Sequence, residues 1–315
     1  MAWLRETWQL LKETARDWSD DDAASLAAAL AYYALLSLAP LLVISIGVAG
    51  WFFGEEAARG RVAGELGAIV GGEAAQGIRS VAQSADQPMR GAVSAVIGIA
   101  TLFVGASGVF GQLQSSMNRI WEVKPKPDQG IWVQVRSRFF SFTMVLGVAF
   151  LLLVSLVLSS LLSSLGTVLA DTLPGGALLW QITNFCLSLA LITVLFALIF
   201  KVIPDAKIKW RDVWLGAGVT AVLFTIGKHL LGLYLGRAAV VDSYGAAGSI
   251  IALVVWVYYA AQILFLGAEF TQARARRRGV AIEPGPTAER SENTGGKDAR
   301  RDDGENGIRR VATTG

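Results

Sequence analysis

The strongest constraint on this chain is a series of apolar runs that are each long enough to cross a bilayer. The last run, from Gly245 to Ala268, shows the pattern most clearly. At about 1.5 Å of rise per helical residue, it covers the roughly 30 Å hydrocarbon core of a membrane. Because backbone polar groups inside lipid must be satisfied within the segment, such runs form helices. The sequence therefore predicts an all-α, polytopic membrane protein.

Six transmembrane helices are expected in one domain over residues 23–270. The chain is 53% hydrophobic and only 17% charged, whereas soluble domains are nearer to one quarter charged. A polar, glycine-rich outer loop is expected over residues 54–90, and it is too small for an independent enzymatic domain. The expected spans are about 23–53, 91–113, 139–165, 178–202, 214–235 and 245–268.

The basic residues predict the orientation of these spans. The N-terminal arm carries three Lys or Arg residues, loop 114–138 five, loop 201–212 four, and the flank after the last span four. The connections on the other side carry four, none and one. Because Lys and Arg gather on the cytoplasmic side, both termini are expected in the cytoplasm. This topology accounts for the basic residues, so they do not indicate nucleic-acid binding.

The two ends of the chain lie outside the spans. Residues 1–22 are expected to form an interfacial amphipathic helix, which either lies among lipid headgroups or docks on the cytoplasmic loops. Residues 271–315 begin with an arginine cluster and continue without periodicity, so we expect a basic flank and a disordered cytoplasmic tail. The apolar face of the N-terminal helix consists of Leu4, Trp8, Leu11, Ala15 and Trp18.

The composition excludes several kinds of chemistry. The chain has one histidine and one cysteine, which rules out a multi-histidine metal site and a disulfide framework within the chain. The adjacent carboxylates of Asp20, Asp21 and Asp22 are interpreted as the start of a helix rather than as a metal site. Neither of the glycine-rich nucleotide-binding motifs occurs. We therefore expect no enzymatic activity, no cofactor and no ATP-driven step.

Two ionisable residues of the fifth span are candidate ligand-binding residues. Lys228 lies about 5 Å from the midplane at 1.5 Å per residue, and His229 follows it. An ionisable group at this depth suggests a functional site. The alternative is a lysine that snorkels to the interface and a core histidine bonded to a carbonyl. Lys228 lacks an obvious acidic partner in the sequence, so the phosphate of an anionic lipid is a candidate ligand.

Other polar and small residues mark a candidate pathway and the helix contacts. Tyr258, Gln262 and Glu269 share one face of the last span, and Gln262 needs a partner across a helix or in a wet cavity. Glu269 is expected near the interface, about 19 Å from the span centre, and ranks below Gln262. Pro40 either kinks the first span or breaks it, and broken helices often line transporter sites. Close helix packing is expected at the small residues Gly105, Gly108, Gly245, Ser249 and Ala252.

Several stretches resemble the YihY/BrkB family of bacterial inner-membrane proteins over about residues 10–275. The resemblance implies six spans in the inner membrane and an ill-defined function, described either as transport or as serum-resistance virulence. The family has also carried the label ribonuclease BN. A single histidine and the lack of a paired acid and base argue against nuclease activity. The stretches are AAALAYYALLSLAPLL, Asn118–Trp121, residues 204–228, and YGAAGSIIALVVWVYYAAQILFLGAEF.

The sequence thus predicts a multi-pass bacterial inner-membrane protein that transports or exports a lipid or another amphipathic or anionic solute without ATP. The alternative is a non-transporting scaffold of the cell envelope. The phospholipid bilayer is the expected partner, an anionic lipid is a candidate ligand, and a homo-oligomer remains open.

Overall fold

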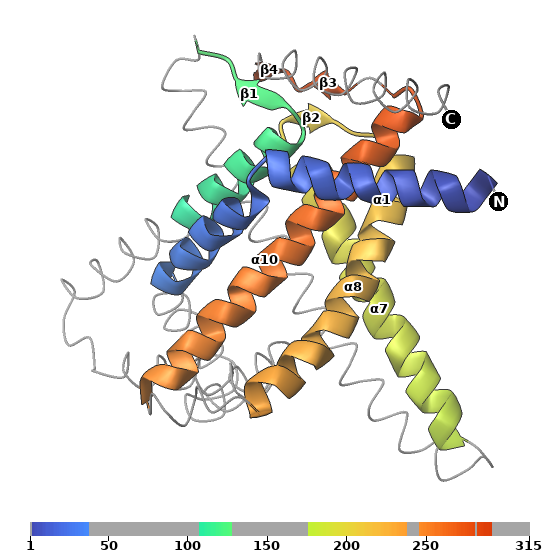
Figure 1. Cartoon of the computed structure of the whole chain (residues 1–315), viewed down its shortest axis with the longest axis vertical. Coiled ribbons are helices and arrows are strands. Elements are labelled where there is room, and N and C mark those ends of the chain that lie inside the picture. The colour runs from blue at the N-terminus through green and yellow to red at the C-terminus, as the bar shows by residue number, and fades with distance from the viewer. Residues whose placement is uncertain (1, 38–106, 128–175, 238–245, 281, 292–315) are drawn as a thin grey trace, which may run out of the picture.

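The computed structural model describes five parts of the chain, and these are mainly helical (Figure 1). Spans 23–53 and 91–113 are described only in part. Span 139–165, loop 54–90, Pro40, Gly105 and Gly245 lie outside the described residues. The described parts are residues 2–37, 107–127, 176–237, 246–280 and 282–291.

Three helices in these parts are long and apolar enough to cross a membrane. They are α7 (Gly176–Val202), α8 (Trp210–Arg237) and α10 (Ala246–Arg277). They correspond to the spans expected at 178–202, 214–235 and 245–268, although α10 continues well past Ala268. Shorter helical stretches cover residues 23–37 and 107–120. The total of six spans and the cytoplasmic position of both ends stay predictions.

Helices α8 and α10 pack through a reciprocal pair of glycine and threonine contacts. Thr220 Oγ1 donates to the carbonyl of Gly216 and Thr271 Oγ1 donates to that of Gly267, each at 2.7 Å. Each threonine also fills the space beside the glycine of the other helix. A Cβ added to Gly216 would lie 1.7 Å from Thr271 Oγ1, and one added to Gly267 would lie 1.9 Å from Thr220 Oγ1. The two glycines therefore let the helix backbones approach closely.

The packing residues expected from sequence lie at other contacts. Ala252 is buried beside Leu231 of α8. Gly108 lies against the ring of Tyr33, which a Cβ on the glycine would approach to 2.8 Å. Ser249 belongs to α10, but its side chain is outside the described set. The sequence pattern thus indicated that small residues bring helices together, and it did not single out the Gly216–Thr271 and Gly267–Thr220 contacts.

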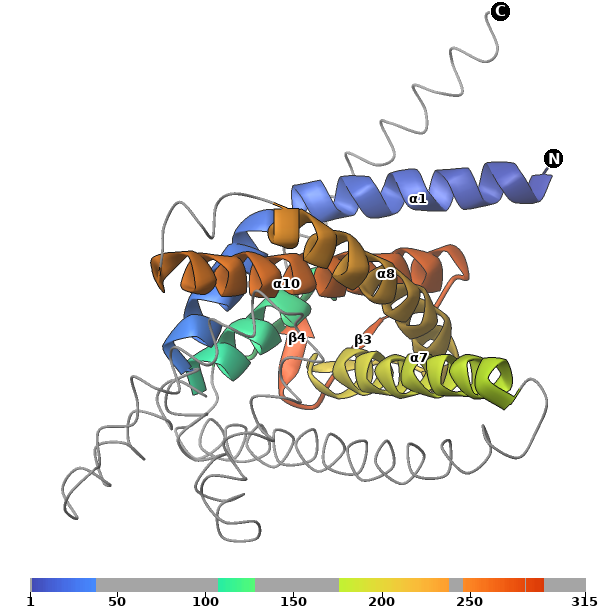
Figure 2. The ribbon, with the colours of Figure 1, turned by 90° about the horizontal axis from the view of Figure 1, so that it is seen from below.

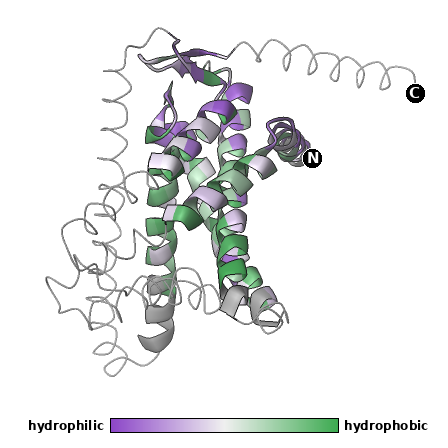
Figure 3. Cartoon of the chain, turned by 90° about the vertical axis from the view of Figure 1, so that its left-hand side faces the viewer, coloured by the Kyte–Doolittle hydropathy of each residue, from purple (hydrophilic) through white to green (hydrophobic). Residues whose placement is uncertain are grey.

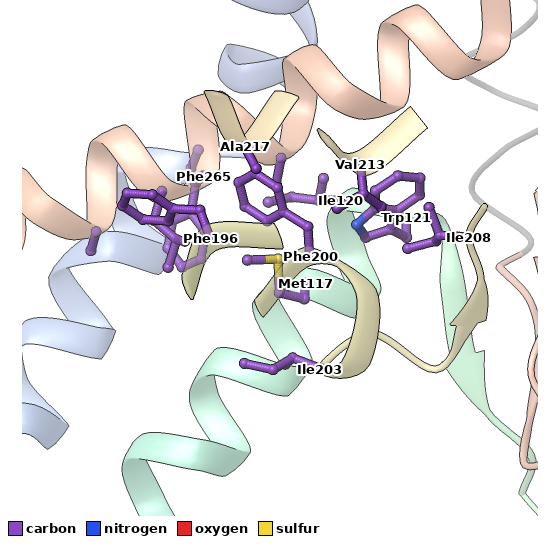
Figure 4. Packing of buried hydrophobic residues seen from close by; sticks show 14 of the residues in the cluster. Met117, Ile120, Trp121, Phe196, Phe200, Ile203, Ile208, Val213, Ala217 and Phe265 are labelled. Atoms are coloured by element: carbon purple, nitrogen blue, oxygen red, sulfur yellow. The ribbon is translucent and has the colours of Figure 1, made fainter. Parts of the chain in front are cut away.

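One apolar core joins the helical stretches at residues 23–37 and 107–120 to α7, α8 and α10 (Figure 4). Trp121, Phe200 and Phe265 are among its largest fully buried side chains. They come from three segments that are far apart in sequence, so the core fixes these segments relative to one another. Figure 4 labels Met117, Ile120, Trp121, Phe196, Phe200, Ile203, Ile208, Val213, Ala217 and Phe265.

The expectation that residues 271–315 form only a basic flank and a disordered tail is wrong for the segment 282–291. This segment, called the strap here, contains β3 (Glu283–Pro284) and β4 (Ala288–Arg290). β4 pairs with β1 (Val123–Pro125) and β3 pairs with β2 (Ala206–Lys207), both antiparallel. Figure 3 shows these hydrophilic strands at one end of the bundle, beyond the hydrophobic helices. The strap is ordered because two distant loops supply its hydrogen-bond partners, which local composition does not reveal.

Helix α1 (Ala2–Asp20) crosses α10 near the C-terminal end of α10 (Figures 1 and 2). Thr14 and Asp17 are buried, whereas Trp8 is 61% exposed and Leu11 48%. The helix therefore docks on its own chain through a polar face and leaves apolar residues open. The sequence left two arrangements open for this helix: contact with lipid headgroups, or docking on the cytoplasmic loops. In the structure the helix docks on its own chain, although on α10 rather than on a loop. Contact with lipid headgroups stays a proposal.

Candidate functional site

One face of α10 carries an unusual row of polar residues and points into the bundle. Residues spaced by three or four positions share a helix face. Along this face Phe265 and Glu269 are 0% exposed, and Gln272 is also buried. We call the row the inward face of α10, and it runs from the middle of the candidate span to its basic end. Its members are Tyr258, Gln262, Phe265, Glu269, Gln272 and Arg276.

Gln262 lies close to the middle of the candidate span. Its Oε1 atom is buried and has no hydrogen-bond partner within the part of the chain that the structure describes. An amide oxygen without a donor costs free energy in a low-dielectric environment. The partner across a helix that the sequence predicts is therefore not found among these residues.

Glu269 lies about 10 Å further along the same face, at 1.5 Å per residue, and the sequence underestimated its burial. Its depth along the helix suggested an interfacial residue, yet it is fully buried. Its neighbours Phe265 and Ala268 belong to the core cluster that also contains Ala27 and Ile120. At Glu269, α10 is therefore enclosed by other parts of the chain. The sequence indicates only where a residue lies along the helix axis. That position does not reveal which other segments surround the residue.

The other candidates do not gather around Gln262 in one group. Lys228 is half-buried on α8 and has a hydrogen-bonding, ring or electrostatic partner. An anionic lipid as a ligand of Lys228 stays a prediction. His229 is exposed on the surface of α8. Tyr258 lies one turn from Gln262 on the same face and packs against the main core.

The arginine cluster at the end of α10 has a role that the sequence did not reveal. Each of three consecutive arginines pairs with a different acidic group. Arg276 binds the nearly buried carboxylate of Asp17, and its Nη1 lies 3.8 Å from Glu122 Oε1. Arg277 makes two 2.7 Å hydrogen bonds to Glu13, and Arg278 pairs with Asp212 at 3.0 Å. The basic flank expected from topology thus also holds α1 and the start of α8 against α10.

A second polar contact joins two of the stretches that resembled a known family. Asn118 Nδ2 donates to Asp205 Oδ2 at 2.9 Å, and the Asp205 backbone N–H donates to Asn118 Oδ1 at 2.8 Å. Gln114 donates to the same carboxylate at 3.2 Å. The Gly285 N–H of the strap donates to the Asp205 carbonyl at 2.7 Å. Asp205 therefore connects the helix at 107–120, the turn after α7 and the strap.

The described residues contain no group of three or more His, Cys, Asp or Glu side chains arranged to hold a metal ion. The polar groups on the inward face of α10 offer polar contact instead. The amide of Gln262 and the carboxyl group of Glu269 supply it, inside a helix that is otherwise apolar enough to span a membrane.

Comparison with known proteins identifies the family. A model of the family described as virulence factor BrkB matches residues 14–292. The chain belongs to the BrkB family. The match ends just after the strap, so the family region includes the two strands as well as the helices. Neither this family description nor the names of the relatives below state an enzymatic activity.

Several curated relatives of this BrkB-family chain are called UPF0761 membrane proteins. The relative from Tolumonas auensis is 32% identical over 180 residues, which is 56% of each chain. The relative from Halorhodospira halophila is 28% identical over 80% of this chain but only 54% of its own length. The relative from Pseudoalteromonas translucida is 27% identical over 89% of both chains. The chain thus spans little more than half of the first two. No solved structure matches it.

Proposed function

We propose that this BrkB-family protein moves a lipid or another amphipathic or anionic solute across the bacterial inner membrane without hydrolysing ATP. The observation that carries the proposal is the inward face of α10. Toward α8, this helix presents Gly267 and Thr271, as expected for a close contact that holds helices together. Toward the interior of the bundle, it presents Gln262 and Glu269 instead.

Each of these groups is costly in a purely structural role. Leaving a buried amide oxygen without a donor costs about 1–3 kcal/mol, and ionisable groups inside membrane bundles mark solute or proton pathways. A passing solute or water molecule offsets the cost at Gln262 by donating to its buried oxygen. The carboxyl group of Glu269 binds and releases a proton or a cationic group two turns nearer to the basic end. The absence of a nucleotide-binding motif leaves a gradient or downhill movement as the driving force.

Reconstitution into liposomes tests this proposal. The probes are fluorescent phosphatidylglycerol, fluorescent phosphatidylcholine and an anionic amphipathic dye, and the measurement is their movement between leaflets or across the bilayer. We expect movement above that in protein-free vesicles for at least one probe. Gln262→Leu should reduce it severalfold, because leucine keeps the volume and removes the amide.

Val257→Leu is the matched control. Val257 lies about 140° away from Gln262 around the helix at 100° per residue, so its substitution should leave movement unchanged. Equal rates with and without protein for all three probes would overturn the proposal and leave the non-transporting scaffold. If the protein speeds probe movement and Gln262→Leu does not reduce that rate, the pathway does not pass Gln262.

A further inference from the structure

We propose that α1 lies flat on the membrane surface, with Trp8, Leu11 and Ala15 in the bilayer and with a basic edge on the headgroups of anionic phospholipids. The basic edge consists of Arg5, Lys12 and Arg16. This lipid-binding surface is separate from the inward face of α10 and does not depend on the proposed transport function.

The first step is that the rotation of α1 about its own axis is fixed. Asp17 is buried and accepts a hydrogen bond from Arg276. Arg277 binds Glu13 through two 2.7 Å hydrogen bonds, and its Nη1 donates to the carbonyl of Glu6 at 3.2 Å. Both arginines belong to the last turn of α10. The acidic side of α1 is thereby turned toward the basic end of α10.

The second step is that the apolar side of α1 points the other way. At about 100° per residue, Trp8, Leu11 and Ala15 lie roughly opposite Glu6 and Glu13 around the helix. Away from its arginines, α10 continues into the apolar candidate span. The proposal places the flank of α1 that faces away from the arginines at the level where the hydrocarbon begins.

The third step is that this flank is open in the structure. Trp8 is 61% exposed and Leu11 48%, so the described part of the chain leaves this flank uncovered. Figure 2 shows α1 at the edge of the bundle, with its N-terminal part extending beyond α10. In a protein that spans a bilayer, lipid occupies the space beside a span at this level. Lipid is therefore the occupant that the geometry favours over a protein partner.

The fourth step concerns the charge beside the apolar flank. Arg5, Lys12 and Arg16 lie on the side away from the docked residues Thr14 and Asp17, and all three are exposed. Lys12 Nζ lies 5.5 Å from the centre of the Trp8 ring, and Arg16 Nε lies 3.7 Å from Asp20. Long basic side chains beside an interfacial tryptophan reach the headgroups. Three such cations at one edge favour negatively charged headgroups.

Spin labelling of the full-length protein tests the position of the flank. In a Cys186→Ser background, the label is placed by Leu11→Cys or, as a control, by Gln9→Cys, which is exposed on another side of α1. The protein is measured in nanodiscs of phosphatidylcholine with and without phosphatidylglycerol. The label at residue 11 should be more accessible to oxygen than to a water-soluble nickel chelate, and the label at residue 9 should show the reverse.

Two results at residue 11 would overturn the position of the flank. A label that the nickel chelate reaches as easily as at residue 9 would place the flank in water. A label that neither reagent reaches would show that protein covers it.

The preference for anionic lipid is tested separately, by comparing the association of spin-labelled phosphatidylglycerol and phosphatidylcholine with the protein. Replacing Arg5, Lys12 and Arg16 together by glutamine should reduce the preference for phosphatidylglycerol. Lys207→Gln, an exposed cation on β2, should not change it. An unchanged preference in the triple variant would overturn the assignment of anionic headgroups. Because all four cations are exposed, the variants should fold.

Discussion

The close contact between α8 and α10 makes the substitution Gly267→Ala a sharp test of the packing. The new Cβ would lie 1.9 Å from Thr220 Oγ1 and 2.9 Å from both Cβ and Cγ2 of the same threonine. Rotation of the threonine side chain does not relieve the contact with its Cβ. Rotation would also break the 2.7 Å hydrogen bond from Thr220 to the Gly216 carbonyl. The two helices must therefore move apart.

A comparison with an open glycine on α8 gives the expected size of the effect. Overpacking of a tight contact costs about 1–3 kcal/mol. Gly218→Ala meets nothing within 4 Å, and alanine favours a helix over glycine by about 1 kcal/mol. Because both substitutions replace a glycine by alanine inside a helix, the gain in helix propensity is common to both. The two variants should therefore differ in free energy of unfolding by the overpacking cost alone, roughly 1–3 kcal/mol. Adding Thr220→Ala to Gly267→Ala should restore much of the loss, because it removes Oγ1 and Cγ2.

Unfolding by sodium dodecyl sulfate in mixed micelles, followed by circular dichroism, measures these differences where refolding is reversible. The contact predicts a strong coupling between Gly267→Ala and Thr220→Ala in a double-mutant cycle. Equal stability of the Gly267→Ala and Gly218→Ala proteins would show that the helices do not approach each other at this glycine.

Two further predictions concern the end of the bundle that carries the strap. Arg276→Met removes the arginine from the nearly buried Asp17 and should cost about 3 kcal/mol. Arg277→Met, whose partner carboxylate is 43% exposed, should cost about 1 kcal/mol or less. The same unfolding titration compares the two variants. Equal losses of unfolding free energy would contradict the expectation that the more deeply buried ion pair contributes more. Truncation that removes the strap takes away the partner of β2 and should speed tryptic cleavage after Lys207; an unchanged rate would show that the strap does not protect this turn.

The long helices follow from the sequence because the signal for them is local. A continuous apolar run fixes a spanning helix whatever surrounds it, so α7, α8 and α10 lie close to the expected ranges. The amphipathic N-terminal helix is likewise present, since its periodicity lies within residues 2–20. The family resemblance also holds, over residues 14–292.

The remaining features depend on which distant segments meet. Arg277 and Glu13 are separated by 264 positions, so the pattern of basic residues predicts a side of the membrane and contains no information about their partners. The strap is polar and aperiodic, and its order comes from pairing with β1 and β2. Glu269 is fully buried because neighbouring segments enclose it. Gln262 could be singled out as a candidate because a polar residue inside an apolar run is visible in the sequence itself.

The central claim is that the inward face of α10 is a polar pathway rather than a dry contact, and thiol accessibility at Gln262 tests it most directly. In a Cys186→Ser background, Gln262→Cys is compared with Ala260→Cys, which lies about 160° away around the helix at 100° per residue. Both proteins are treated in proteoliposomes with a membrane-impermeant methanethiosulfonate reagent. The pathway predicts rapid modification at residue 262 and little at residue 260. Protection of both positions would show that water does not reach Gln262 and would contradict the claim.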